Sequence, residues 1–490
     1  MFRTGLPILT GIALMTYVIV RAVVLPITHD ESNTCLTYST MSVHDIVTYA
    51  LPIPNNHILN TLLIKFFTSI FGMHPLPARL PNILGFALYF ISVFLITRKV
   101  TIDPMVTFFG ICVMVFNPYL IDFFSLARGY ALSISLMMIS LYFSLLFLQH
   151  FKNKHLAWSV ILGALAVYAN FTTLNFYAAL VGLLGIAAAQ HGWLQRKTTQ
   201  HFWKPVMMQW LILFTGSFVL ATASYIPISK MIATDQFVYW GTNGFYKDTV
   251  LTLLFSSQYG IEYFNLHEAG FSYLMIGFVA VMLVCAIFEF LRNKLVLSNS
   301  IHAFFMFVFI GTIVVNILQF YLVHTPYLTF RTALFFYPIL AVNFIFFAEW
   351  LRRKMPSSRF YFSLSLSLLS LIHFARAANF TFCREWWYDA DTCKVISYLE
   401  QEHEKNNDII TLNSSWWFFP SLNFHIETEN KNWIHLAPFH QDFIPEKDLS
   451  YNYYYATSDD TKLIAADYDT VLSLGWNSRF LMKRKQEIQN

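Results

Sequence analysis

The sequence predicts a polytopic α-helical membrane protein that ends in a small extracytoplasmic α/β domain. The 490-residue chain is 56% hydrophobic, and its mean hydropathy is +0.50. Only 12% of the residues are charged, whereas a soluble domain carries about 25%. Apolar runs of about 20 residues, the length that crosses a bilayer, recur up to residue 378. Together these observations exclude an ordinary soluble protein.

Hydropathy places about eleven spanning helices in this part of the chain. They are expected near 5–26, 79–98, 104–120, 129–148, 156–172, 174–190, 206–229, 269–291, 300–323, 330–349 and 360–377. With this count, the basic loop residues fall on one side of the membrane, which the positive-inside rule makes cytoplasmic. These residues are Arg98, Lys99, Lys152, Lys154, Arg196, Lys197, Arg292, Lys294, Arg352, Arg353 and Lys354.

Two outer loops stand out under this topology. The loop 28–78 is expected to hold two juxtamembrane helices, around 42–50 and 57–71. Apolar residues in the second recur about every four positions, which is typical of an amphipathic helix at the membrane surface. The loop 230–268 is aromatic and is expected to contribute an interfacial belt, with a lid over a groove as the alternative. Its aromatic residues are Phe237, Tyr239, Trp240, Phe245, Tyr246, Tyr259 and Tyr263.

The composition changes near residue 378, so the sequence predicts a transmembrane domain over 1–378 and a separate α/β domain over 379–490. A helix is expected at 391–404, and strands at 408–412, 453–457 and 471–474. The five cysteines lack metal-type spacing, and a disulfide between Cys383 and Cys393 is left open. The chain has no P-loop, Rossmann fingerprint or basic nucleic-acid patch, so no nucleic-acid partner is expected.

Charged residues gather at the predicted outer membrane edge. Asp30 and Glu31 follow the first apolar run, and Arg21 lies inside it, where a charge needs a polar partner or an anion. Three more arginines open predicted spans, namely Arg79, Arg128 and Arg331. Singly, each arginine is most often a membrane-edge anchor, and the acid pair is a solvated helix cap in about half of such cases. Together they indicate chemistry on a phosphate-linked lipid, because arginine binds phosphate bidentately and a carboxylate can deprotonate an acceptor.

The order of short motifs resembles the GT-C integral-membrane glycosyltransferases, near the protein O-mannosyltransferases and aminoarabinose transferases. The motifs are Asp30-Glu31, Asn56-His57, Arg79-Leu80-Pro81, Ala127-Arg128-Gly129-Tyr130 and Phe330-Arg331-Thr332. The resemblance covers about residues 5–378 and implies a GT-C fold. It also implies transfer of a sugar from a polyprenyl-phosphate donor to an extracytoplasmic glycan, lipid or protein acceptor, as in the biosynthesis of cell-envelope glycans.

The resemblance implies a role for each matching residue. Asp30 would be the general base, and Glu31 would position the acceptor. Where a divalent cation (Mg or Mn) is used, Asp30, Glu31 and His57 would be its candidate ligands. Arg331, with Arg128 or Arg21, would bind the donor phosphate. The remaining substrate contacts implied are His57, Asn56, Arg79 and Tyr130.

Several departures limit the choice of reaction. The loop with Asp122 has no Asp-x-Asp pair, and Trp416-Trp417 is followed by Phe418, so peptide N-glycosylation is disfavoured. The alternatives are a transporter or flippase of lipid-linked sugars, which would more often show inverted repeats, and a non-catalytic scaffold. The resemblance to bacterial members favours the bacterial inner membrane over the ER.

Overall fold

The computed structural model describes residues 5–196, 203–236, 241–261, 268–440, 450–475 and 478–485. These residues form two compact units, each made from several stretches of chain. The first unit contains 1–19, 42–63 and 81–378. The second contains 20–41, 64–80 and 379–490, so it includes part of the first predicted outer loop together with the C-terminal region.

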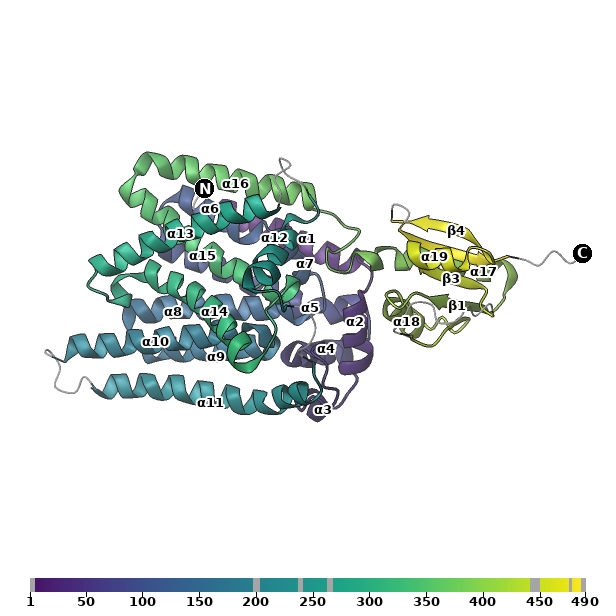
Figure 1. Ribbon diagram of the computed structural model, residues 1–490, viewed down its shortest axis with the longest axis horizontal. Helices are drawn as coiled ribbons and strands as arrows, with labels where there is room; N and C mark the ends of the chain where they lie inside the picture. Colours follow the sequence, from purple (N-terminus) through teal and green to yellow (C-terminus); the bar gives the residue numbers. More distant parts are fainter. Residues whose placement is uncertain are drawn as a thin grey trace, which may run out of the picture. The chain divides into compact units, whose positions relative to one another are not determined.

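Long helices dominate up to residue 377 (Figure 1). In chain order they are α1 (Gly5–Val24), α2 (His29–Asn33), α3 (Val43–Val47), α4 (Ile58–Phe71), α5 (Pro75–Val100), α6 (Pro104–Val115), α7 (Pro118–Phe124), α8 (Gly129–His150), α9 (Asn153–Ala169), α10 (Leu174–Gln195), α11 (Trp203–Ala233), α12 (Thr252–Gln258), α13 (Glu268–Arg292), α14 (Ile301–Val323), α15 (Phe336–Lys354) and α16 (Pro356–Ala377).

Eight helical stretches within the described residues are long and apolar enough to cross a membrane. A ninth is counted if α6 and α7, which are bent by 67° relative to each other, form one span. The bend follows from the sequence, because Asn117 caps α7 by accepting from Leu120 N–H at 3.0 Å and Pro118 opens that helix. The other two predicted spans correspond to α9 and α16. The polytopic helical fold class is thus confirmed.

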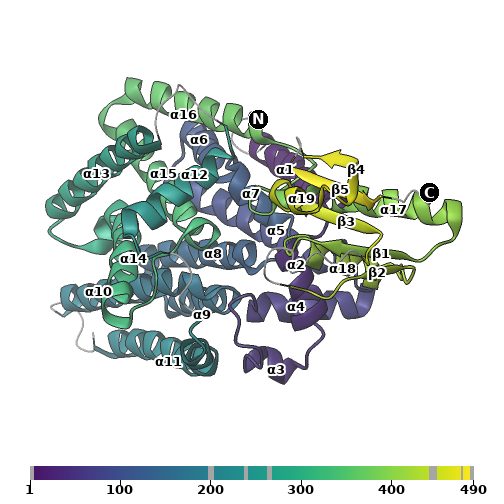
Figure 2. The same ribbon diagram turned by 45° about the vertical axis from the view of Figure 1, so that its right-hand side comes forward.

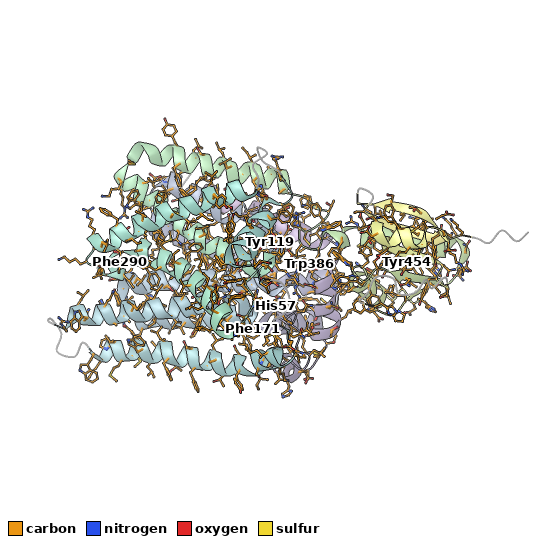
Figure 3. The ribbon with its side chains drawn as sticks, viewed as in Figure 1. His57, Tyr119, Phe171, Phe290, Trp386 and Tyr454 are labelled. Atoms are coloured by element: carbon orange, nitrogen blue, oxygen red, sulfur yellow. The ribbon has the colours of Figure 1, made fainter. Side chains whose placement is uncertain are left out.

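The helices of the first unit run back and forth in an antiparallel manner. Figure 1 shows the turns α8–α9, α13–α14 and α15–α16, which carry basic residues, at the same end of these helices. Figure 2 gives a second view of the neighbouring helices α8, α9, α10 and α11. Side chains fill the spaces between the helices, with His57 and Phe290 labelled among them (Figure 3).

Helix α4 buries several polar side chains and exposes aromatic ones. Asn60 and Thr61 are fully buried, and Asn82 Nδ2 donates to Asn60 Oδ1 at 3.0 Å. Phe66 and Phe71 are 55% and 58% exposed. This pattern is the reverse of a helix on a water-soluble protein, and it suits a helix whose outer face contacts lipid.

Of the predicted aromatic loop, Phe245, Tyr246 and Tyr259 are described. Tyr259 is buried, and its hydroxyl donates to both carboxylate oxygens of Asp122, at 3.0 and 2.8 Å. The remaining predicted belt residues, Phe237, Tyr239, Trp240 and Tyr263, lie outside the described residues, as does Lys197 of the predicted basic loops.

The C-terminal region forms a five-stranded mixed sheet with helices, which confirms the predicted α/β class. The strand order is β2-β1-β3-β5-β4, with β1 parallel to β2 and β3, and β5 antiparallel to β3 and β4. The strands are β1 (Ile410–Ser414), β2 (Ile434–Leu436), β3 (Tyr453–Thr457), β4 (Tyr468–Leu474) and β5 (Arg479–Arg484). The helices are α17 (Thr392–Asn406), α18 (Phe419–Thr428) and α19 (Ser458–Ile464). All five cysteines are free thiols, including Cys383 and Cys393.

Candidate functional site

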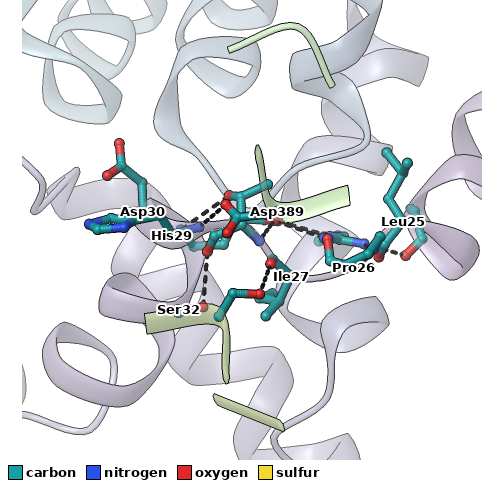
Figure 4. A network of polar contacts seen from close by, with 12 residues as sticks. Leu25, Pro26, Ile27, His29, Asp30, Ser32 and Asp389 are labelled. Atoms are coloured by element: carbon teal, nitrogen blue, oxygen red, sulfur yellow. Dashed lines mark hydrogen bonds and ion pairs between the residues drawn. The ribbon is translucent and has the colours of Figure 1, made fainter. Parts of the chain in front are cut away.

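The acidic pair lies just after α1 in the second unit, within residues 25–33, the segment called the corner below. Thr28 caps the short helix α2: its hydroxyl accepts from Glu31 N–H at 3.4 Å, and Glu31 Oε2 accepts from Thr28 N–H at 2.9 Å. This reciprocal capping box fixes the first turn of α2. Asp30 is half-buried, and its carboxylate points away from Asp389 and Ile27 (Figure 4).

Arg79, on α5, uses all five of its N–H donors inside the protein. Nε and Nη2 bind the two carboxylate oxygens of Glu31, each at 2.8 Å. Nη1 donates to the carbonyls of Ala22 and Leu25 at 2.9 Å, and Nη2 also donates to Pro26 O at 2.8 Å. The arginine and glutamate side chains are both 0% exposed. Arg79 therefore caps the C-terminal end of α1 and neutralises a buried carboxylate.

Arg21, on α1, is also fully buried and binds backbone oxygens of the same unit. Its Nη1 donates to Asn379 O at 2.6 Å, and its Nη2 donates to Phe382 O at 3.0 Å. The arginine predicted inside the first apolar run thus has polar partners, as the cost of burying a charge requires. It fastens the beginning of the C-terminal segment to α1.

The C-terminal region supplies a third carboxyl group that sequence reasoning missed. Asp389 Oδ2 accepts the backbone N–H of His29 at 2.7 Å, and Asp389 is only 2% exposed. Burial raises the pKa of Asp389 well above its usual range, and the nearby charges of Asp30 and Glu31 reinforce the shift. The available signal was its position directly after the aromatic run that starts at Trp386. An acidic residue in such a run is a candidate for burial.

Two further residues of the C-terminal region hold the same corner. Ser421 Oγ, on α18, donates to Ile27 O at 2.7 Å. His29 Nδ1 lies 3.0 Å from the carbonyl oxygen of Trp417, and since that oxygen can only accept, Nδ1 carries the proton. The backbone around Asp30 is therefore fixed by side chains and carbonyls that lie about 360 residues or more further along the chain.

Three other predicted site residues lie around Tyr130, itself a predicted site residue, in the first unit. Arg331 Nε donates to the Tyr130 hydroxyl at 3.3 Å, and the Arg128 guanidinium carbon lies 5.9 Å from the Tyr130 ring centroid. The His57 and Tyr130 rings pack edge to face with centroids 5.0 Å apart. Two cationic groups thus converge on one tyrosine, an arrangement that can bind an oxyanion.

The backbone packs closely against this cluster at Gly129. A Cβ there would lie 2.3 Å from Ala169 O and 2.6 Å from His57 Cβ, so only glycine fits. Asn56 fixes the turn before His57, because its Nδ2 donates to Ile46 O at 3.0 Å. The Tyr49 hydroxyl donates to Asn56 O in the same turn. In this structure the Asn56 amide therefore stabilises the hinge between α3 and α4.

The predicted cation ligands do not form a metal site in the described part of the chain. No group of three or more His, Cys, Asp or Glu residues is placed to hold an ion there. Both carboxylate oxygens of Glu31 accept hydrogen bonds from Arg79, and one also accepts from Thr28. The surroundings of the Glu31 carboxylate thus suit the Arg79 guanidinium rather than a metal ion.

Comparison with known proteins adds one sequence match. Residues 56–219, about a third of the chain, match the family described as dolichyl-phosphate-mannose-protein mannosyltransferase. This stretch contains Asn56, His57, Arg79, Arg128 and Tyr130. The match confirms the resemblance to GT-C glycosyltransferases over these residues. No curated protein matches the chain.

Solved structures are similar at low sequence identity. ArnT from Cupriavidus metallidurans bound to undecaprenyl phosphate is 12% identical, with 98% of each chain covered and a TM-score of 0.45. The Archaeoglobus fulgidus oligosaccharyltransferase, in complex with Zn and sulfate, is also 12% identical with a TM-score of 0.45. That match covers 96% of this chain and 73% of the other.

Proposed function

We propose that this protein is a membrane glycosyltransferase that moves a sugar from a polyprenyl-phosphate donor to an acceptor hydroxyl. The observation that carries the proposal is the family match over 56–219, because it contains His57, Arg128 and Tyr130, three members of the cluster in the first unit. The matched family is named for a polyprenyl-type donor, dolichyl phosphate mannose. The candidate spans supply the membrane setting that such a lipid requires.

The proposed reaction is a single displacement at the anomeric carbon. The acceptor oxygen loses its proton to a carboxylate as it attacks the carbon. The bond from that carbon to the phosphate oxygen breaks, and polyprenyl phosphate leaves with the electron pair. The sugar inverts its configuration. The protein must therefore supply a base for the acceptor and positive charge for the leaving phosphate.

We assign the base to Asp30, which is half-buried, rather than to Glu31, whose carboxylate is closed off by Arg79. Glu31 then positions the backbone of α2. A base in this role contributes about 10²–10⁴-fold to the rate.

The phosphate-binding role falls to Arg331 and Arg128, with Tyr130 and His57 as neighbouring substrate contacts. Arg79 is left out of the substrate-binding set because all its donors are engaged. We also assign Arg21 to the backbone of the C-terminal segment instead of the donor phosphate.

We further propose that the acceptor side is extracytoplasmic and that the membrane is the bacterial inner membrane. Support comes from the basic residues that flank the turns at one end of the helices, such as Arg292 at the end of α13 and the three cations that end α15. Alkaline phosphatase fused after Lys485 should be active in cells and β-galactosidase inactive. The opposite pair of results would refute this orientation.

Sugar transfer by the purified protein tests the proposal. A panel of radiolabelled polyprenyl-phosphate sugars is offered to the wild type, to Asp30→Asn and to Asp45→Asn, a control carboxylate on α3 that is 45% exposed. Transfer should fall by about 10²–10⁴-fold in Asp30→Asn alone while donor binding is retained. Equal transfer by Asp30→Asn and the wild type would refute the assignment of the base. If the protein moves donor lipid across vesicle membranes but transfers no sugar, it is a flippase and the proposed function is refuted.

A further inference from the structure

The second unit contains a cysteine, a histidine and a glutamate in a row, none of which the proposed sugar transfer uses. Cys393 Sγ lies 3.6 Å from His425 Nε2, and His425 Nδ1 lies 2.7 Å from Glu429 Oε1. A nucleophile in contact with a base, which a third group orients, is the usual signature of an activated side chain. The order of the three groups is therefore that of a reactive thiol.

Cys393 is also the exposed member of the five cysteines, all of which lie in described parts of the chain. Cys35, Cys112 and Cys383 are buried, and Cys285 is partly buried in α13. Cys393 is the second residue of α17, where the helix dipole favours negative charge. A thiol at such a position meets solvent-borne reagents that the other four do not.

The histidine is held in its charged form. Burial alone would lower the pKa of His425, but its hydrogen bonds to Cys393 and Glu429 outweigh burial and raise the pKa to about 9. The His425 side chain is 8% exposed. Lys431 lies 3.5 Å from Glu429 and 2.9 Å from Glu400, so it balances the acidic side of the cluster. At neutral pH the imidazolium can stabilise a sulfur anion and can later give up a proton.

The geometry is supported by apolar packing. Ile396 and Leu399 of α17 belong to the same buried cluster as Leu422 and Ile426 of α18. Ile396 lies three residues after Cys393 and Leu422 three residues before His425, about one turn along each helix. The two helices are thus fixed by a shared core, which keeps the sulfur beside the imidazole.

We propose that Cys393 is a modification site, a nucleophilic thiol that exchanges with disulfides of low-molecular-weight thiols. In the reacting pair, the Cys393 sulfur attacks as an anion while His425 Nε2 carries a proton. The Cys393 sulfur attacks one sulfur of the small disulfide, forming a mixed disulfide while the original S–S bond breaks. The departing thiolate takes the proton from His425 Nε2 and leaves as a thiol. One thiol and one disulfide enter, and one thiol and one disulfide result, so no further oxidant is needed.

Reaction rates with an aromatic disulfide reagent test this proposal on the full chain in detergent. Between pH 5.5 and 8, the Cys393 rate should stay nearly flat, whereas an ordinary thiol reacts about tenfold faster per pH unit. His425→Gln should slow the reaction about tenfold at pH 6.5 and restore the ordinary slope. Glu429→Gln should slow the reaction less and restore only part of the ordinary slope. His435→Gln, an exposed histidine on β2, should change nothing.

Mass spectrometry after incubation with glutathione disulfide identifies the modified residue. One glutathione should be found on Cys393 in the native protein and none in Cys393→Ser. The proposal is overturned by an ordinary pH slope in the wild type, by His425→Gln reacting at the wild-type rate, or by modification elsewhere. The wild-type slope alone decides the matter if His425→Gln does not fold.

Discussion

Replacing Arg79 by methionine should destabilise the protein strongly. The substitution keeps a similar chain length but removes the guanidinium, which binds both oxygens of Glu31. It leaves a carboxylate that is 0% exposed without its countercharge. Removing one partner of a buried ion pair costs about 3–5 kcal/mol. The carbonyls at the end of α1 also lose their donor, and each unsatisfied buried group costs about 1–3 kcal/mol.

A loss of this size is a large share of the roughly 5–15 kcal/mol that stabilises a folded domain. The thermal midpoint of the detergent-solubilised protein should fall by roughly 5–15 °C. Size-exclusion chromatography after heating measures it. Arg98→Met provides the control on the same helix, because Arg98 is partly exposed and packs over Phe94. That variant should remain within about 1 kcal/mol of the wild type.

The double variant Arg79→Met/Glu31→Gln separates the two contributions. With the carboxylate gone, no buried charge is left uncompensated, so the double variant should be more stable than the sum of the single effects by about 0.5–3 kcal/mol. Additive effects, or an Arg79→Met midpoint equal to that of Arg98→Met, would refute the role of Arg79 as the cap of this corner.

Three further predictions concern other parts of the site. Gly129→Ala should lower both stability and sugar transfer, since the new methyl group collides with Ala169 O and His57 Cβ; normal transfer would contradict this. Arg331→Met should raise the KM for the donor about tenfold or more, measured by initial rates, while an unchanged KM would remove Arg331 from phosphate binding. The thermal midpoint of Asp389→Asn should exceed that of the wild type by an amount that grows as the pH increases from 4 to 8. The raised pKa of Asp389 means that the folded wild type holds a proton that the unfolded chain releases, so wild-type stability falls as pH rises; a constant difference would contradict this.

Hydropathy was sufficient to predict the helical part of the fold, but some elements were beyond it. Strand β2 has three residues, too few for a periodic pattern, and β5 (Arg479–Arg484) begins and ends with arginine. The bend between α6 and α7 did have a signal, because an asparagine followed by Pro118 is a typical helix start. A continuous apolar run concealed it.

The candidate site was likewise predictable only in part: the positions of its residues follow from the local sequence, but their long-range contacts do not. The position of Asp30 after the first apolar run follows from the local sequence. The pairing of Glu31 with Arg79 joins residues 48 positions apart, and the contact of His29 with Asp389 joins residues 360 apart. No periodicity encodes such contacts, because they depend on how whole helices and the C-terminal region fold. For that reason Arg79 could be predicted as a polar group at the membrane edge but not as the cap of α1.

The two adjacent acids illustrate how the fold gives different roles to similar residues. Neighbouring residues on a helical turn point about 100° apart, so when Glu31 faces Arg79, Asp30 must face elsewhere. Glu31 is buried in a bidentate ion pair and cannot exchange protons with a substrate without breaking that pair. Asp30, on the same short helix, is half-buried and points away from Asp389. If either acid is a base, the helix geometry therefore favours Asp30, and Glu31 serves by holding that geometry still.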